Sequence, residues 1–269
     1  MEAKSLCLEQ SVDRLVVVSD LHAFLGPLCK IDEWRAKLPG RSQVIVNGDL
    51  FSTGTEPLET LQWVRARAGE FVVMGNHDEE VLELSPGHHP LYDAAGVSEA
   101  LTVDQRQYVS QFPYRLEVHW RGHLLRLMHG HRTLSGQMRP PDSFMTKPSQ
   151  LVRLYGDPNV DLTILGHTHF AFLHQDGDTI VANCGSVSLP ILAVRKDGEG
   201  VIPQTDALVL EPEGDLRSTF LSVSEGEGAL AVEIVRFGYD RGEALQRLEQ
   251  VGYPHMQRLR LLSAEGLLI

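Results

Sequence analysis

Side chains that can bind metal ions recur directly after short apolar runs in the first two thirds of this chain. The positions are Asp20, His22, Asp49, Asn76, His77, Asp78, His129, His131, His167 and His169. Each apolar run has the length and composition of a buried strand. The carboxyl ends of parallel strands meet at one edge of an open α/β sheet, where such folds place their ligand sites. Five separate runs that end in this way are hard to explain as ordinary turns, so we expect these side chains to converge.

The types of these side chains favour a binuclear metal centre. Imidazole, carboxylate and amide oxygen, without thiolate, suit Mn, Fe, Zn, Co or Ni. Seven candidate ligands are too many for one ion and fit two: Asp20, His22, Asp49, Asn76, His129, His167 and His169. Asp49 is the natural bridge because a carboxylate can contact both ions. Two ions about 3.5–4 Å apart promote in-line displacement at phosphorus and acidify a bound water, so we expect hydrolysis of a phosphoester by metal-bound hydroxide.

The apolar pattern predicts the elements that carry these residues. Residues 15–18, 44–46 and 71–74 are predicted strands separated by segments with helical periodicity, an order that favours parallel strands with crossover helices. Further predicted strands form hairpins around Arg121-Gly122 and Asp176-Gly177, and one spans residues 160–165. After Pro190 the sequence predicts strands at 191–194, 207–210, 216–221 and 229–235, and then a helix that carries Leu245 and Leu248. Residues 132–149 form the longest irregular stretch, either a lid or a surface excursion.

Composition limits the class of protein. The chain has 269 residues and a formal net charge of −12, without a Lys/Arg run, which argues against a broad nucleic-acid-binding surface. No apolar run approaches the ~20 residues of a membrane helix, and the charged N-terminal residues do not resemble a signal peptide. The three cysteines form no paired motif. We expect a cytoplasmic protein that acts on a small phosphoester substrate, with homo-oligomerisation left open.

The motifs together resemble those of the calcineurin-like metallophosphoesterase superfamily. Its blocks D-x-H, G-D, G-N-H-D/E, H and G-H-x-H occur here in order, as Asp20-Leu21-His22, Gly48-Asp49, Gly75-Asn76-His77-Asp78, His129 and Gly166-His167-Thr168-His169. The segment from Asn183 to Pro190 is similar to the N-P-G-S-V-x-x-P block of small bacterial phosphodiesterases of the superfamily, with Cys184 in place of the first Pro. The resemblance covers about residues 15–190.

This resemblance implies a fold and a role for each motif residue. The fold would be an α/β four-layer αββα sandwich with two mixed sheets. It would form one domain over residues 1–269, in which residues 191–269 extend the second sheet and add a helix. One ion would take Asp20, His22, Asp49 and His169, and the other Asp49, Asn76, His129 and His167. His77 would be the catalytic histidine that contacts the phosphoryl oxygen or protonates the leaving group. The two divalent ions would be Mn first, with Fe, Ni, Zn or Co also possible.

Two further residues have less definite roles. Asp78 either orients the His77 imidazole or caps the helix that follows. His131, the second histidine of an H-G-H triplet, either lies behind the metal ligands or is a solvated loop residue.

The choice of phosphoester depends on one departure from the family pattern. Ser/Thr protein phosphatases of the superfamily carry an Arg that grips a phosphomonoester, and Thr53 stands at the corresponding position here. Without that bidentate partner, a phosphodiester is the better substrate. A phosphomonoesterase would need Arg132 or Arg139 instead. A nucleotide or dinucleoside polyphosphate hydrolase is also compatible with these motifs, as is a non-catalytic scaffold of the same fold.

Overall fold

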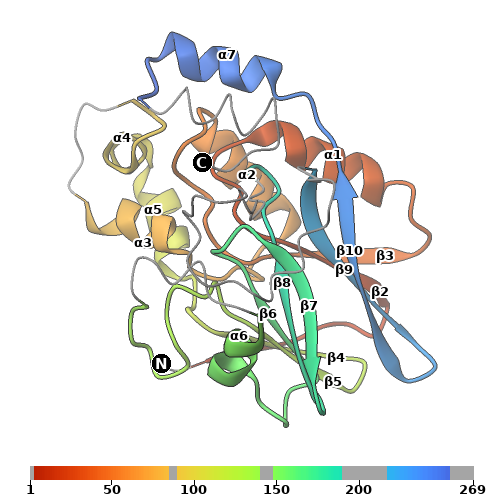
Figure 1. The fold of residues 1–269 in the computed structure, drawn as a ribbon. Helices are drawn as coiled ribbons and strands as arrows, with labels where there is room; N and C mark the ends of the chain where they lie inside the picture. Colours follow the sequence, from red (N-terminus) through yellow and green to blue (C-terminus); the bar gives the residue numbers. More distant parts are fainter. Residues whose placement is uncertain (1–2, 85–89, 140–147, 190–216, 255–269) are drawn as a thin grey trace, which may run out of the picture.

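Two mixed β-sheets run through the computed structural model of the chain, which describes residues 3–84, 90–139, 148–189 and 217–254 (Figure 1). The six-stranded sheet has the order β1 (Lys4–Cys7), β4 (Leu116–Trp120), β5 (His123–Leu127), β6 (Leu162–Leu165), β8 (Thr179–Cys184) and β7 (Ala171–Asp176). The four-stranded sheet has the order β10 (Ala229–Phe237), β9 (Ser218–Gly226), β2 (Val12–Val18) and β3 (Arg41–Val46). Strands β2 and β3 pair in parallel whereas β2 and β9 pair antiparallel, and the larger sheet likewise contains both kinds of pair.

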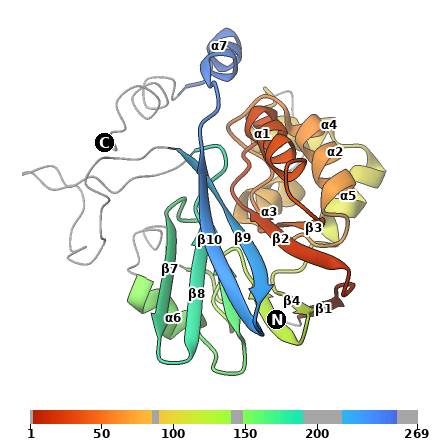
Figure 2. The same ribbon diagram turned by 90° about the vertical axis from the view of Figure 1, so that its right-hand side faces the viewer.

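Helices cover the outer faces of both sheets. The described helices are α1 (Leu25–Arg35), α2 (Pro57–Arg67), α3 (Asn76–Glu83), α4 (Ala94–Ala100), α5 (Val103–Ser110), α6 (Pro148–Tyr155) and α7 (Gly242–Gln250). Figure 2 shows α1 to α5 on one side of the molecule and α6 on the other, with the two sheets between them. Helix α6 packs against β7 and β8 of the larger sheet.

Side chains of β2 alternate between two separate apolar cores. Leu15 and Val17 point into the core between the two sheets, while Val16 and Val18 point into the core beneath the helices. A strand that is buried on both faces has an almost continuous apolar sequence, which explains the run Leu15-Val16-Val17-Val18. A third core, which includes Tyr155 of α6, covers the outer face of the larger sheet. The predicted four-layer αββα sandwich with two mixed sheets is confirmed.

The predicted strand at residues 71–74 is reduced to a single parallel bridge between Val46 and Val72. The amide of Val73 donates to the Val46 carbonyl over 2.9 Å, but the amide of Met74 turns away to the Pro113 carbonyl. The chain therefore leaves the sheet after one bonded pair. Strand β1 and helices α4, α5 and α6 were not anticipated, whereas both predicted hairpins are present as β4–β5 and β7–β8.

The part of the chain after residue 216 contributes two of the four strands of the smaller sheet. Strand β9 pairs antiparallel with β2, β10 forms the outer edge, and α7 follows. The strands predicted at 191–194 and 207–210 lie outside the described residues. Among the described helices, none has the length and apolar character needed to cross a membrane.

Candidate metal centre

The seven predicted ligands lie on the loops that follow the strands. Asp20 and His22 follow β2, Asp49 follows β3, and His129 follows β5. His167 and His169 follow β6, and Asn76 is the first residue of α3. Because these loops meet at one end of the two sheets, side chains up to 147 positions apart in sequence come into contact, as His22 and His169 do.

Among the described residues, three groups of three side chains lie close enough together to hold a metal ion; two of them consist of predicted ligands alone, and the third contains His77. Asp20, His22 and His169 place one ligand atom each within 4.8 Å of one another, and so do Asp49, His129 and His167. The Nε2 atoms of His22 and His169 are 3.0 Å apart. His169 Nε2 lies 3.2 Å from Asp20 Oδ1, and His129 Nε2 lies 3.1 Å from Asp49 Oδ2. Each of these two groups thus directs its lone pairs at a common point.

Burial leaves some of these polar atoms without partners. Asp20 and Asp49 are 0% and 1% exposed. Asp20 Oδ1 and His129 Nε2 are buried and have no hydrogen-bond partner among the described residues. A buried polar atom without a partner costs about 1–3 kcal/mol, and more if it is charged. A cation would satisfy both atoms, so the residues present fit the divalent ions that the sequence implies.

Backbone carbonyls fix the orientation of two ligand rings. The carbonyl oxygens of Asn47 and Leu189 lie 2.7 Å from Nδ1 of His129 and of His169, respectively. A carbonyl oxygen can only accept, so each Nδ1 carries a proton, and Nε2 is the nitrogen that each ring in its neutral form would present to an ion. This arrangement, in which the second nitrogen is held by an acceptor, is the usual one for metal-bound histidine.

The pKa shifts show a site that requires positive charge. Burial and the charge on His169 lower the pKa of His22 to about 3, and burial and the charge on His129 lower that of His167 to about 4. Burial disfavours charged His129 too, but the carboxylates of Asp49 and Asp20 outweigh it and raise its pKa to about 10. In the metal-free chain a proton on His129 therefore compensates the buried carboxylates, a role that cations could fill.

Local backbone strain coincides with the candidate ligands. Asp20, His22, Asp49, His167 and His169 all have positive φ, between 49° and 66°. Non-glycine residues seldom adopt this conformation, and such strain clusters at functional sites. Gly75 allows the chain before Asn76 to approach, because a Cβ there would lie 2.2 Å from the backbone nitrogen of Asp49.

Asp78 holds the loop that carries Asp49. Its buried carboxylate accepts hydrogen bonds from the backbone amides of Asp49, Leu50 and Gly75 over 2.8–3.0 Å. The last of these bonds caps α3, as one of the two predicted roles requires. The ring of His77 is oriented by another carboxylate, because its Nδ1 lies 3.2 Å from Glu80 Oε2.

His77 borders both candidate ion sites. One of its ring nitrogens lies within 4.8 Å of ligand atoms of His22 and Asp49. Burial lowers the pKa of His77, but the charge of Asp49 and the hydrogen bond and charge of Glu80 outweigh burial and raise it to about 9. The metal-free chain therefore holds this imidazole protonated at neutral pH.

His131 lies beside the candidate ligands. Its ring centroid is 5.5 Å from that of His129, and its Nε2 lies 3.4 Å from Glu79 Oε2. Glu79 also pairs with Arg132 and accepts a hydrogen bond from the Tyr114 hydroxyl over 2.6 Å. His131 is buried, as expected for a residue behind the ligands and not for a solvated loop residue.

Several contacts that support the site come from the segment Asn183–Pro190, which the sequence marked by its similarity to a family block. The hydroxyls of Ser186 and Ser188 each donate to the Asp20 carbonyl over 2.8 Å, and the Asn183 amide donates to the Gly166 carbonyl over 2.7 Å. All three belong to the Asn183–Pro190 block, whose resemblance to the family segment assigned them no contact. Its run of hydroxyl residues was the available signal.

Comparisons with known proteins agree with this geometry. Residues 14–202, which are most of the chain, match the model of the calcineurin-like phosphoesterase superfamily domain. A symmetrical bis(5'-nucleosyl)-tetraphosphatase from Marinomonas sp. is 34% identical over 91 residues, which are 34% of this chain and 33% of that protein. The chain thus aligns with about a third of the length of this curated relative.

Solved structures share the fold. The crystal structure of a metallophosphoesterase from Sphaerobacter thermophilus superposes with a TM-score of 0.67 at 19% identity, covering 95% of this chain and 100% of that one. That of a putative diadenosine tetraphosphatase gives a TM-score of 0.54 at 14% identity, covering 88% of this chain and 100% of that one.

Proposed function

The chain belongs to the calcineurin-like phosphoesterase superfamily and is a phosphoester hydrolase, and on this premise we propose that it is a phosphodiesterase with a binuclear metal centre. The observation that carries the proposal is the pair of adjacent ligand groups, Asp20/His22/His169 and Asp49/His129/His167. Manganese is the first candidate metal, followed by Fe, Ni, Zn and Co, since the set contains no thiolate. A cytoplasmic location belongs to the proposal, and the unpaired cysteines are compatible with it.

The proposed ligand sets share one carboxylate. Asp49 completes the first group as a bridge, and Asn76 completes the second, in which its Oδ1 lies 2.8 Å from His167 Nδ1. When bound, two divalent ions would offset charge on the phosphoryl oxygens and lower the pKa of an attacking water.

His77 is the proposed proton donor to the leaving oxygen. Glu80 accepts at Nδ1 and so sets the plane of the ring and the position of its proton. In the metal-free chain burial is outweighed by the charge of Asp49 and the hydrogen bond and charge of Glu80, which raise the pKa of His77 to about 9. General acid catalysis of this kind contributes roughly 10²–10⁴-fold to a rate.

The arginines that a phosphomonoesterase would need are engaged by other groups. Arg139 is buried, and its guanidinium donates to the Gly130 carbonyl over 2.9 Å. Arg132 pairs with Glu79 and stacks on Tyr114 at 4.8 Å. Thr53, at the position of the family's phosphate-binding Arg, offers no positive charge. These placements support a diester, which carries one negative charge fewer than a monoester.

A second candidate function is hydrolysis of a dinucleoside polyphosphate. It is favoured by the 91-residue similarity to a bis(5'-nucleosyl)-tetraphosphatase. Such a substrate has phosphoanhydride bonds in which every phosphorus is also doubly substituted, so the uncharged Thr53 suits it equally well.

The test compares three substrates on metal-stripped protein reloaded with Mn²⁺, Ni²⁺, Fe²⁺ or Zn²⁺: bis(p-nitrophenyl) phosphate, p-nitrophenyl phosphate and diadenosine tetraphosphate. His77→Ala is the active-site variant. His123→Ala is the matched control, because His123 also pairs through Nδ1 with a carboxylate, Asp161, at 3.3 Å. His123 lies at the start of β5, whereas the loop that carries His129 follows the end of that strand.

We expect diester cleavage that requires metal, collapses in His77→Ala and persists in His123→Ala. Faster cleavage of diadenosine tetraphosphate selects the second candidate. Faster monoester cleavage contradicts the proposal, as does the absence of turnover when two ions are bound, which points to a non-catalytic scaffold.

A further inference from the structure

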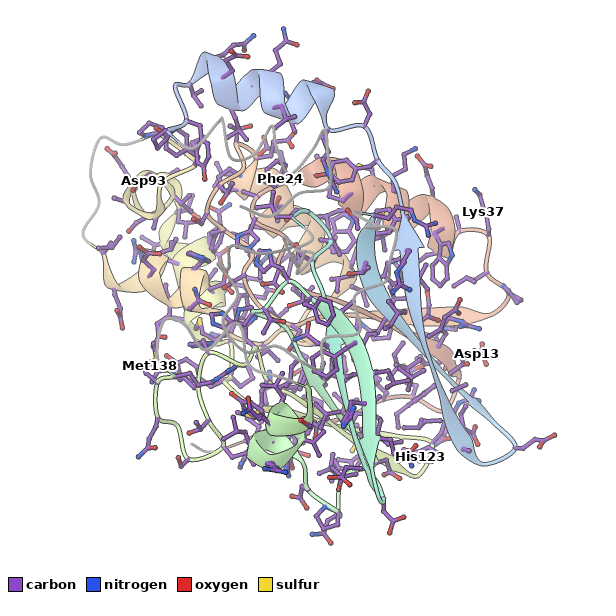
Figure 3. The ribbon with its side chains drawn as sticks, viewed as in Figure 1. Asp13, Phe24, Lys37, Asp93, His123 and Met138 are labelled. Carbon is purple, nitrogen blue, oxygen red and sulfur yellow. The ribbon has the colours of Figure 1, made fainter. Side chains whose placement is uncertain are left out.

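The C-terminal segment from Tyr239 to Tyr253, which contains α7, lies beyond the residues that match the family model. Figure 1 shows α7 lying across the end of the molecule where α1 and α4 also lie. Leu248 of α7 is fully buried in an apolar cluster with Phe24, and Leu189 packs against the same cluster. Figure 3 shows Phe24 on the side of the fold that faces α7. The segment therefore contacts the loop that carries His22, through Phe24, and the loop after β8, through Leu189.

Tyr239 reaches the loop that orients His169. Its hydroxyl donates to the Ser188 carbonyl over 3.2 Å. The carbonyl of the next residue, Leu189, receives the Nδ1 proton of His169, and the Ser188 hydroxyl donates to the Asp20 carbonyl. The Tyr239 ring lies against α1 at Gly26, where a Cβ would lie 3.4 Å from Tyr239 Cδ2. The Tyr239 hydroxyl thus holds the peptide group that joins Ser188 to Leu189. The Ser188 hydroxyl bonds to Asp20 and the Leu189 carbonyl bonds to His169, and both of these residues are proposed ligands.

Arg247 reaches the loop that carries His22. Its guanidinium donates to Glu56 Oε1 over 2.5 Å. The other oxygen of Glu56 accepts from the Leu25 amide at the start of α1 over 3.1 Å, and the Glu56 amide donates to the Ala23 carbonyl over 3.0 Å. Ala23 follows His22 directly and has a strained backbone, with φ of 57°. Arg247 therefore holds Glu56. Glu56 in turn bonds to Ala23 and to Leu25 and so fixes the turn that follows His22.

We propose that Tyr239 and Arg247 are positioning residues that set the geometry of the ion site formed by Asp20, His22 and His169. This proposal rests on the metal assignment made above. Both contacts lead to the same ligand group: the Tyr239 contact leads to His169 through the loop after β8, and the Arg247 contact leads to the loop that carries His22. The second group is held by other residues, since Asn47 orients His129 and Asn76 contacts His167. Loss of either contact weakens one ion site and leaves the other unchanged.

Tyr239→Phe tests the first contact, because it removes the hydroxyl and keeps the ring. Tyr108→Phe is the matched control: the Tyr108 hydroxyl also donates to a backbone carbonyl, that of Gly69, over 2.5 Å, but on α5. Metal-free protein is titrated with Mn²⁺ by calorimetry, and its thermal unfolding is recorded without metal. We expect one of the two ions to bind roughly 10-fold or more weakly in Tyr239→Phe, with both affinities retained in Tyr108→Phe.

Arg247→Ala tests the second contact and keeps the proposal testable if Tyr239→Phe does not fold. Arg65→Ala is its control, because the Arg65 side chain pairs with Asp104 and is 41% exposed, close to the 43% of Arg247. We expect the same site-selective loss in Arg247→Ala alone. Unchanged affinities, or an equal loss at both sites, overturn the positioning role. A parent protein that binds no ions overturns the proposed function as well, so the two failures are distinguishable.

Discussion

The Nδ1 atom of His129 lies 2.7 Å from the carbonyl oxygen of Asn47, so the ring of this buried histidine has a single orientation. The Asn47 side chain in turn donates to the Met128 carbonyl over 3.1 Å, which ties the loop after β3 to the loop after β5. The Nε2 of His129 consequently faces Asp49 at 3.1 Å. The two loops and the ring therefore form one connected unit.

Replacing His129 tests the second ligand group directly. His129→Gln removes both the ligand nitrogen and the proton that compensates Asp49. We expect loss of one of the two ions and a fall in kcat/KM beyond the 10–100-fold that is typical of changes behind the ligands. Metal analysis of the purified variant, with kinetics on the preferred substrate, checks this. Retention of two ions with full activity would contradict the assignment.

The contact between His77 and Glu80 predicts that substitutions at these two positions lower kcat to different extents. His77→Ala removes the proposed proton donor, so kcat should fall by roughly 10²–10⁴-fold while both ions remain bound. Glu80→Gln keeps a hydrogen-bond acceptor but removes a charge that raises the pKa of His77, so its effect on kcat should be smaller. Steady-state kinetics with metal analysis separates the two effects. If Glu80→Gln impaired catalysis as much as His77→Ala, the proposed division of roles would be wrong.

The sequence predicted that the candidate ligands lie close together, because each follows a short run of branched apolar residues. Such runs form buried strands, and the first of them are joined by segments with helical periodicity that are long enough for crossover helices, which favours parallel pairing. The alternation of β2 between two cores, with Leu15 on one side and Val16 on the other, follows from the same pattern. The strand predicted at 71–74 was reduced to a bridge by a competing contact with Pro113, which local pattern does not reveal.

The supporting contacts could not be predicted, for two physical reasons. The acceptors for His129 and His169 are backbone carbonyls, and every residue has one, so the residue type carries no signal. The contact from Tyr239 to Ser188 spans 51 positions and that from Arg247 to Glu56 spans 191. Long-range pairs of this kind depend on how the layers pack, which helical or strand periodicity does not determine.

We expect the stability of the folded chain to fall in acid because of Asp161, which lies away from the candidate metal centre. Its carboxylate accepts from the Leu124 amide over 2.8 Å and lies 3.3 Å from the His123 ring, which ties the start of β5 to the chain just before β6. The backbone hydrogen bond is the main cause that lowers the pKa of Asp161 below its usual value. Because the folded pKa is lowered, the stabilisation is present above the unfolded pKa and is lost as pH falls through the folded value.

Asp161→Asn should therefore lower the midpoint of thermal unfolding at pH 7 and have a progressively smaller effect as the pH falls below about 4. The side chain is 46% exposed, so the loss should not exceed about 1 kcal/mol. Thermal unfolding of both proteins across this range of pH checks this. A difference that stayed constant across the range would show that the charge of Asp161 is not involved.

Removal of metal should destabilise the parent protein. Ions that bind the folded chain alone stabilise it by about 2.7 kcal/mol at 100 times the dissociation constant, so a chelator should lower the unfolding midpoint by roughly 5–10 °C for a chain of this size.

Asp20→Asn should abolish the stabilisation that the first ion provides. In the metal-free form Asp20→Asn should lower the unfolding midpoint, because burial is outweighed by the charges of His169 and His129, which hold the pKa of Asp20 below its usual value and so let the ionised carboxylate stabilise the folded chain. Calorimetric unfolding of both proteins, with and without Mn²⁺, measures the two effects together. If Asp20→Asn destabilised the metal-free protein and kept the metal-dependent gain, Asp20 would be a structural residue rather than a ligand.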